Sequence, residues 1–254
     1  MNVRAIKYMI LAVLACLFIC SLASSGLLQA NAWVKGFNRL MMLCGDLFPP
    51  KLDILPQLLS AVGQTIQIAF TGTLIGFFLS LPLAYLGNNI LFSRRVTVVV
   101  RWLLGIVRTV PSIVFGVIFV VAFGLGEAAG IMAVACYTVG YLAKLFYEAF
   151  EAVDPEIIEA IRSTGAKRLQ LFRFAILPET THMLISQLLF MFEYNIRSST
   201  IMGFVGAGGI GYYMLGYIQM LQYEHLAAAL LTTLVVVMII DQISLNIRRL
   251  IHHP

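Results

Sequence analysis

Five polar side chains interrupt the apolar stretch of residues 182–203: Glu193, Asn195, Arg197, Ser198 and Ser199. Charges buried in a lipid bilayer are costly, so they usually face a cavity or a partner side chain. An arginine beside two serine hydroxyls combines a fixed positive charge with neutral donors, which suits an oxyanion. Alternatively, Glu193 and Arg197 are four residues apart and pair along one helix. We favour an anion path because the polar run is longer than one ion pair requires, and leave open whether these two residues pair.

A second candidate for the path is Arg108, which lies in the sequence Arg-Thr-Val-Pro-Ser before a further apolar run. The proline of this sequence, Pro111, loosens the helical hydrogen-bond ladder and allows a hinge inside a span. Arg108 either lines the path or extends its charge to the inner headgroups, and the second behaviour is common for long basic side chains. Asp241, in the last apolar run, either pairs with an arginine or lies close to the inner interface, and the sequence leaves both alternatives open.

The basic segment Glu159–Pro178 separates two apolar runs and carries four lysine and arginine side chains around a central glycine, Gly165. Apolar residues recur at near-helical spacing on both sides of Gly165, which predicts two short amphipathic helices joined at this glycine. Pro178 then starts a new helix, because proline is tolerated in a first turn. Such an elbow is either a docking surface for a soluble partner or a solvated loop whose charges anchor the topology.

The whole chain has 254 residues, of which 60% are hydrophobic and only 11% charged, and its mean hydropathy is +0.92. Soluble domains carry about 25% charged residues, so the composition indicates a membrane protein. At about 20 residues per transmembrane helix, the chain holds five or six spans and no separate soluble domain. The net charge of +5 is then explained by positively charged inner loops rather than by nucleic-acid binding. The four cysteines and four histidines form no metal-ligand pattern, so we expect no metal site.

The apolar runs predict an all-α polytopic membrane protein with about six transmembrane helices, at residues 8–28, 58–86, 98–123 or 108–123, 128–146, 182–203 and 226–245. The first run is either a cleaved signal peptide or a retained helix, and its length favours a retained helix. Residues 31–56 combine aromatic and charged side chains, as an interfacial helix does. We therefore divide the chain into residues 1–56, an N-terminal transmembrane helix with a periplasmic interfacial segment, and a transmembrane domain of residues 57–254.

Basic residues are distributed unevenly between the two sides of these spans. With the N-terminus inside, only Lys35, Arg39 and Lys51 lie on the outer side, whereas the basic residues of every other loop lie on the inner side. Because inner loops carry the excess of lysine and arginine, both termini and the basic segment are predicted to be cytoplasmic.

Glu159-Ala160, Gly165 and Ile176-Leu177-Pro178 resemble the EAA loop of permease subunits of bacterial ABC importers. Ile161 stands where that pattern has a second alanine. In those permeases the loop forms a coupling helix that inserts into a cytoplasmic ATPase. The resemblance implies that residues 148–180 form a cytoplasmic coupling loop and that these residues contact the ATPase: Glu159, Ala160, Gly165, Ala166, Leu177 and Pro178.

The glycine-rich segment FVGAGGIG lies between the last two predicted spans and resembles the outer-loop motif of methionine and phosphonate importer permeases. A phosphate-binding loop is the alternative, but the segment lacks the Gly-Lys-Ser/Thr ending and a preceding strand. The resemblance implies that these glycines lie at the periplasmic gate: Gly206, Gly208, Gly209 and Gly211.

Longer stretches, including RTVPSIVFGVIF and FEYNIRSSTIMGFVGAGGIGY, are similar to the phosphonate and phosphite permease family in particular. Membership would imply the type I importer fold of methionine permeases, a homodimer, two ATPase subunits that bind ATP and magnesium, and a periplasmic phosphonate- or phosphite-binding protein. Such a permease lies in the bacterial inner membrane, catalyses no reaction and holds no cofactor itself.

Two other functions compete with this interpretation. A methionine-type permease shares the glycine-rich motif and the loop, but a zwitterionic amino acid would not need Arg197 with its two serines. An ATP-independent secondary transporter would show internal repeats, and none is apparent in the sequence.

Overall fold

The computed structural model describes residues 3–26 and 30–252, and every regular element in these ranges is a helix, which confirms the all-α prediction. The chain divides into two compact units, residues 1–50 and 51–254. The first contains α1 (Val3–Ser24) and α2 (Ala30–Leu47). The second contains α3 (Leu55–Leu86), α4 (Arg94–Thr109), α5 (Ser112–Phe123), α6 (Glu127–Glu151), α7 (Pro155–Ser163), α8 (Arg168–Leu171), a π-helical turn (Phe172–Ile176), α9 (Leu177–Gly203), α10 (Ile210–Gln219) and α11 (Tyr223–His252).

The two helices of the first unit differ in character. From Tyr8 to its end α1 carries no charged residue, and its segment Ile6–Ser24 is long and apolar enough to cross a membrane. α2 is amphipathic, with Trp33 and Phe37 exposed on a helix that also carries Lys35 and Arg39, in agreement with an interfacial helix. The predicted end of the first span, Leu28, lies outside the described residues.

The second unit is organised around α6, which packs against α3, α4, α5 and α9. α3 and α6 approach closely because Gly72 and Gly76 of α3 face Val134 and Thr138 of α6. Small residues at such positions let membrane helices pack through van der Waals contact. The interior of the second unit is therefore built on the α3–α6 pair.

Four helices of the described chain are long and apolar enough to cross a membrane, namely α1, α3, α6 and α11. α4 and α5 together form a fifth candidate, although they are bent by 86° at a break. The predicted span of residues 182–203 corresponds to α9, which has 27 residues, about 40 Å of helix. α9 contains too many polar residues to count among these apolar helices, so neighbouring helices must shield its polar side chains from lipid.

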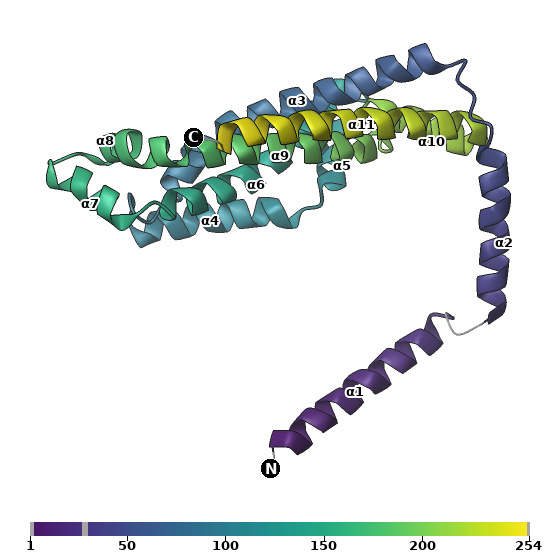
Figure 1. The fold of residues 1–254 in the computed structure, drawn as a ribbon, viewed down its shortest axis with the longest axis horizontal. Helices are drawn as coiled ribbons and strands as arrows, with labels where there is room; N and C mark the ends of the chain where they lie inside the picture. Colours follow the sequence, from purple (N-terminus) through teal and green to yellow (C-terminus); the bar gives the residue numbers. More distant parts are fainter. Residues whose placement is uncertain (1–2, 27–29, 253–254) are drawn as a thin grey trace. The chain divides into compact units, whose positions relative to one another are not determined.

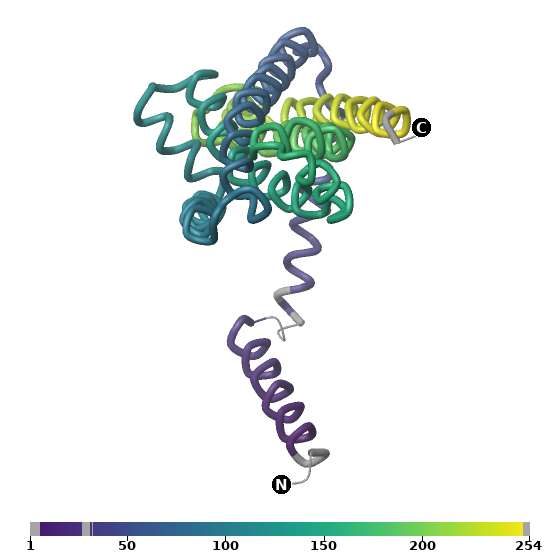
Figure 2. The backbone as a smooth tube through the Cα atoms, turned by 90° about the vertical axis from the view of Figure 1, so that its left-hand side faces the viewer, coloured from purple at the N-terminus to yellow at the C-terminus, as the bar shows by residue number. Residues whose placement is uncertain are grey.

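The coupling-loop helices α7 and α8 lie at one end of the second unit, and α10 lies towards the other (Figure 1). Figure 2 views the same unit with the α7–α8 end towards the reader. Two helical segments lie outside the predicted spans. α4 begins at Arg94, before either start expected for the third span, and the helix α10 lies between the last two predicted spans.

Candidate functional site

Two charged residues of α9, Glu193 and Arg197, are paired with α11. Arg197 donates from Nη1 to Asp241 Oδ2 at 3.0 Å, and Glu193, which is buried, forms an ion pair with Arg248. Glu193 and Arg197 therefore do not pair with each other, so the alternative of an ion pair within α9 is excluded. Asp241 pairs with an arginine, which is one of the two alternatives that the sequence left open for it. Together the two pairs form a charged seam between α9 and α11.

Asn195 lies on another face of α9, in a buried polar cluster between three helices. Its Nδ2 donates to Thr73 Oγ1 of α3 and to Thr138 Oγ1 of α6, both at 2.8 Å. Buried polar groups are costly unless they are hydrogen-bonded, so this cluster fixes the mutual positions of α3, α6 and α9. Ser199 is also buried, and its hydroxyl has no hydrogen-bond partner among the described residues.

Ser198 connects α9 to the start of α5. Its Oγ donates to Ser112 Oγ at 3.1 Å, directly after the break at Val110 and Pro111. Arg108, one turn earlier, places its guanidinium 5.2 Å from the ring centroid of Tyr141, which is a cation–π distance. The structure thus brings Ser198 next to the α4–α5 break, while Arg197 contacts α11 and Asn195 points to a separate cluster.

The coupling loop has the predicted elbow. α7 begins where the Asp154 side chain accepts a hydrogen bond from the Glu156 backbone N–H at 2.9 Å, with Pro155 in the first turn. It ends before Gly165, whose φ of +79° is a left-handed conformation that favours glycine. Glu159 and Ala160 are exposed on α7, Gly165 is exposed at the bend, and Ala166 is half-buried.

The second arm of the loop differs from the prediction. α8 continues through a π-helical turn directly into α9, so Pro178 lies in the first turn of α9 without a preceding break. Leu177 is half-buried and Pro178 is exposed. A cleft of about 460 Å³ lies beside α7, and its lining includes Asn89, Glu151 and Glu159.

The glycine-rich segment forms a tight loop between α9 and α10. Gly206, Gly208 and Gly209 have φ values of +89°, +84° and +74°, whereas Gly211 is buried in the first turn of α10. The Gly126 N–H donates to the Gly206 carbonyl at 2.9 Å, which joins this loop to the α5–α6 turn. The loop is therefore packed against other turns at the end of the unit where α10 begins.

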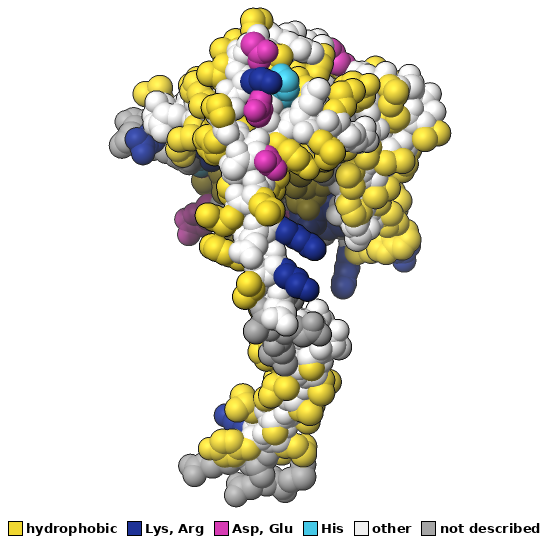
Figure 3. All heavy atoms as spheres, turned by 90° about the vertical axis from the view of Figure 1, so that its right-hand side faces the viewer, with side chains coloured by type: hydrophobic (Ala, Val, Ile, Leu, Met, Phe, Trp, Pro, Cys, Tyr) yellow, Lys and Arg dark blue, Asp and Glu magenta, His cyan; other side chains and the backbone are white. Residues whose placement is uncertain are grey.

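The end of the second unit opposite the coupling loop carries a cluster of acidic and basic side chains (Figure 3). Lys51 Nζ lies 2.9 Å from Glu224 Oε2, and His225 Nε2 lies 3.9 Å from Asp53 Oδ1. The hydrogen bond from Lys51 to Glu224 raises the pKa of the lysine above its ordinary value. These contacts hold the segment before α3 against the start of α11.

Sequence reasoning named the polar residues of α9 and considered an arginine as the partner of Asp241, but it named no other partner. The partners come from helices distant in the sequence: Thr73 of α3, Ser112 of α5, Thr138 of α6, and Asp241 and Arg248 of α11. Thr73 is a polar residue within an apolar run, and such residues often face other helices, which is the signal that could have found it.

Comparisons with known proteins agree on one family. Residues 72–253 match the family described as binding-protein-dependent transport system inner membrane component. The chain is 36% identical over 225 residues to the phosphite transport system permease protein PtxC of Stutzerimonas stutzeri, covering 88% of this chain and 82% of that protein. It is 38% identical over 204 residues to the phosphate-import permease protein PhnE of Mycolicibacterium smegmatis, covering 77% of this chain but 37% of that protein. A solved inward-facing structure of the MetNI methionine ABC transporter superposes with a TM-score of 0.71 at 24% identity, covering 80% of this chain and all of that chain.

Proposed function

This chain belongs to the binding-protein-dependent transport system inner membrane components, and we propose that it is the permease of an ABC importer for a phosphorus oxyanion. Phosphonate, phosphite and hypophosphite are the substrates that we consider first. The similarity to the phosphite permease carries this proposal, because it extends over most of both proteins. The likeness to the methionine transporter is below 25% identity and supports the fold alone.

We place the anion path at Arg197, with Ser198 beside it on α9. The Arg197 side chain is 51% exposed in the single chain, so its guanidinium is open to a ligand although Asp241 already contacts it. Arginine binds phosphorus oxyanions well because its planar guanidinium offers several parallel donors. The Asp241 carboxylate occupies the position that an oxyanion would take, and substrate would therefore compete with it.

The glycine-rich loop with Gly206, Gly208, Gly209 and Gly211 would form the periplasmic gate, and the coupling loop would dock on the ATPase. This assignment puts both termini in the cytoplasm. A second copy of the chain, two ATPase subunits and a periplasmic binding protein would complete the transporter. ATP binding would close the ATPase pair and open the path outwards, and hydrolysis would reset it, with ATP and magnesium held by the ATPase.

The test is ATPase stimulation of the reconstituted complex by its binding protein, loaded in turn with methylphosphonate, phosphite, phosphate or methionine. Stimulation by one of the phosphorus anions is expected, and it would identify the substrate class. Stimulation by methionine alone would contradict the role given to Arg197 and favour an amino-acid importer with the same architecture.

A further inference from the structure

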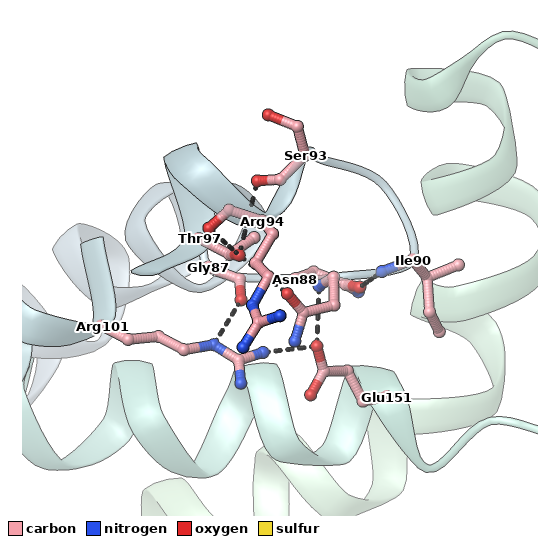
Figure 4. A network of polar contacts seen from close by, with 9 residues as sticks. Gly87, Asn88, Ile90, Ser93, Arg94, Thr97, Arg101 and Glu151 are labelled. Atoms are coloured by element: carbon pink, nitrogen blue, oxygen red, sulfur yellow. Dashed lines mark hydrogen bonds and ion pairs between the residues drawn. The ribbon is translucent and has the colours of Figure 1, made fainter. Parts of the chain in front are cut away.

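The turn between α3 and α4 is fastened to the end of α6 by one arginine and one carboxylate (Figure 4). Arg101 of α4 donates from Nε to the Gly87 carbonyl at 2.9 Å and forms an ion pair through Nη2 with Glu151 of α6. The same Glu151 oxygen accepts the backbone N–H of Asn89 at 2.7 Å. One carboxylate therefore holds both the α4 side chain and the backbone of the turn.

Further contacts fix the orientation of this network. The Arg101 guanidinium lies 4.2 Å from the ring centroid of Tyr147, and Thr97 Oγ1 donates to Asn89 Oδ1 at 2.7 Å. The side chains of Arg101 and Glu151 are only 27% and 25% exposed. An exposed ion pair contributes little to stability, but this arginine is held by a carbonyl, a carboxylate and an aromatic ring at once. It is more constrained than a basic residue that only anchors topology.

Both arms of the coupling loop lie against the same turn. Glu151 is the last residue of α6, four positions before α7 begins at Pro155. On the second arm, the Arg168 guanidinium of α8 lies 5.4 Å from the ring centroid of Phe92 in the turn. A displacement of either arm therefore meets the α3–α4 turn directly.

α4 carries this contact towards the proposed anion path. It has 16 residues, which is about 24 Å of helix. Its far end breaks at Val110 and Pro111, where the chain bends by 86° into α5. Ser112 follows the break and accepts the hydrogen bond from Ser198, the neighbour of Arg197. A stiff helix thus links the coupling loop at one end with a hinge beside the path at the other.

We propose that Arg101 and Glu151 are positioning residues that transmit the movement of the coupling loop to α4. They contact neither ATP nor the anion, and they act by making α4 and the loop move as one body. This inference rests on the proposed function, because it requires an ATPase that moves the loop. Coupling between two distant sites requires an element with two arrangements whose equilibrium both sites shift. Here that element would be the α4–α5 hinge, and the two sites would be the coupling loop and the anion path.

The test uses the complete reconstituted complex with Glu151→Gln, Arg101→Gln and the double variant. The readouts are the ATPase rate with and without binding protein loaded with phosphite, and phosphite import per ATP hydrolysed. We expect each single variant to lose stimulation by at least about fivefold, the lower end of typical coupling between sites. The double variant should lose no more than the singles, because both changes break one interaction.

Lys144→Gln is the matched control, since it breaks the exposed pair of Lys144 with Glu148 at 3.2 Å on the same helix α6 and should leave stimulation unchanged. Arg101→Lys keeps the charge but loses the planar forked arrangement of donors, so it should fall between wild type and Arg101→Gln. Co-purification of the ATPase should be normal in every variant.

Full stimulation in both single variants would overturn the inference. Loss of ATPase co-purification in Glu151→Gln would also overturn it, because the pair would then be needed for assembly rather than for transmission. A wild-type chain that binds no ATPase is a different result, since it would refute the proposed function itself.

Discussion

Arg197 and Asp241 allow a sharp test of the anion path, because the two halves of one ion pair should behave differently. If Arg197 binds the substrate, Arg197→Gln removes the binding charge and should lower the import rate. Asp241→Asn removes only the competing carboxylate, so the guanidinium stays in place and becomes more available. A merely structural pair predicts that both variants fail together.

The expected loss of import in Arg197→Gln follows from the strength of a hydrogen bond to a charged group. A hydrogen bond to a charged group contributes about 1.5–3 kcal/mol, and about 1.4 kcal/mol corresponds to a factor of ten. The two side chains are 51% and 34% exposed, so solvent weakens the interaction and the lower end of this range applies. Arg197→Gln should therefore lower the import rate by about tenfold or more, whereas Asp241→Asn should keep or raise it.

The assay is uptake of radiolabelled phosphite by proteoliposomes that contain the permease and its ATPase, with saturating loaded binding protein. Thermal stability of the purified complex is measured in parallel, and Gln242→Ala, an exposed neighbour on α11, serves as the control. Equal losses of import and stability in Arg197→Gln and Asp241→Asn would refute the anion path and leave a structural pair.

Three further comparisons of variants test the fold and the coupling loop. Gly211→Ala would place its Cβ onto the Thr200 carbonyl oxygen, so the variant should be destabilised as by an overpacked core, by about 1–3 kcal/mol, and the yield of folded permease should fall. Gly216→Ala on the same helix meets no neighbour and should be tolerated, and the two yields are compared by size-exclusion chromatography. Gly165→Val should reduce ATPase co-purification more than Gly165→Asn, because asparagine tolerates the φ of +79° and a β-branched residue does not; equal co-purification of both variants would contradict this. Asn195→Leu removes two interhelical hydrogen bonds, each contributing about 0.6–1.7 kcal/mol, so the complex should inactivate at a lower temperature than the exposed control Asn246→Leu.

Several parts of the fold could be predicted because their cause is local. The apolar runs identified α1, α3, α6 and α11, and the elbow at Gly165 followed from helical spacing interrupted by a glycine. Pro111 was expected to loosen a span, and the chain breaks there. α10 was not predicted because its sequence follows a glycine-rich segment and the helix is stabilised by packing on α9 and α11.

The choice of charge partners could not be predicted, since it depends on how helices rotate against each other. Glu193 pairs with Arg248, which is distant in the sequence and had been assigned only to the inner loops. Arg197 is four residues from Glu193 and would be within reach on an isolated helix. α11 packs beside α9 and offers each charge its own partner, so tertiary contacts override the local pair.

These pairs explain how α9 can hold Glu193 and Arg197 among membrane helices. Each of these two charges is matched by one of opposite sign on α11, so the two pairs together are neutral and avoid the cost of an isolated buried charge. If the proposed anion path is right, an oxyanion that reaches Arg197 would replace the Asp241 carboxylate with another anionic group and would not have to neutralise a bare cation. Binding would then be an exchange of anions, and Arg197 would stay paired between transport cycles. Such an exchange would suit an oxyanion permease, because an unpaired arginine is costly among membrane helices and an uncharged path would not select the anion.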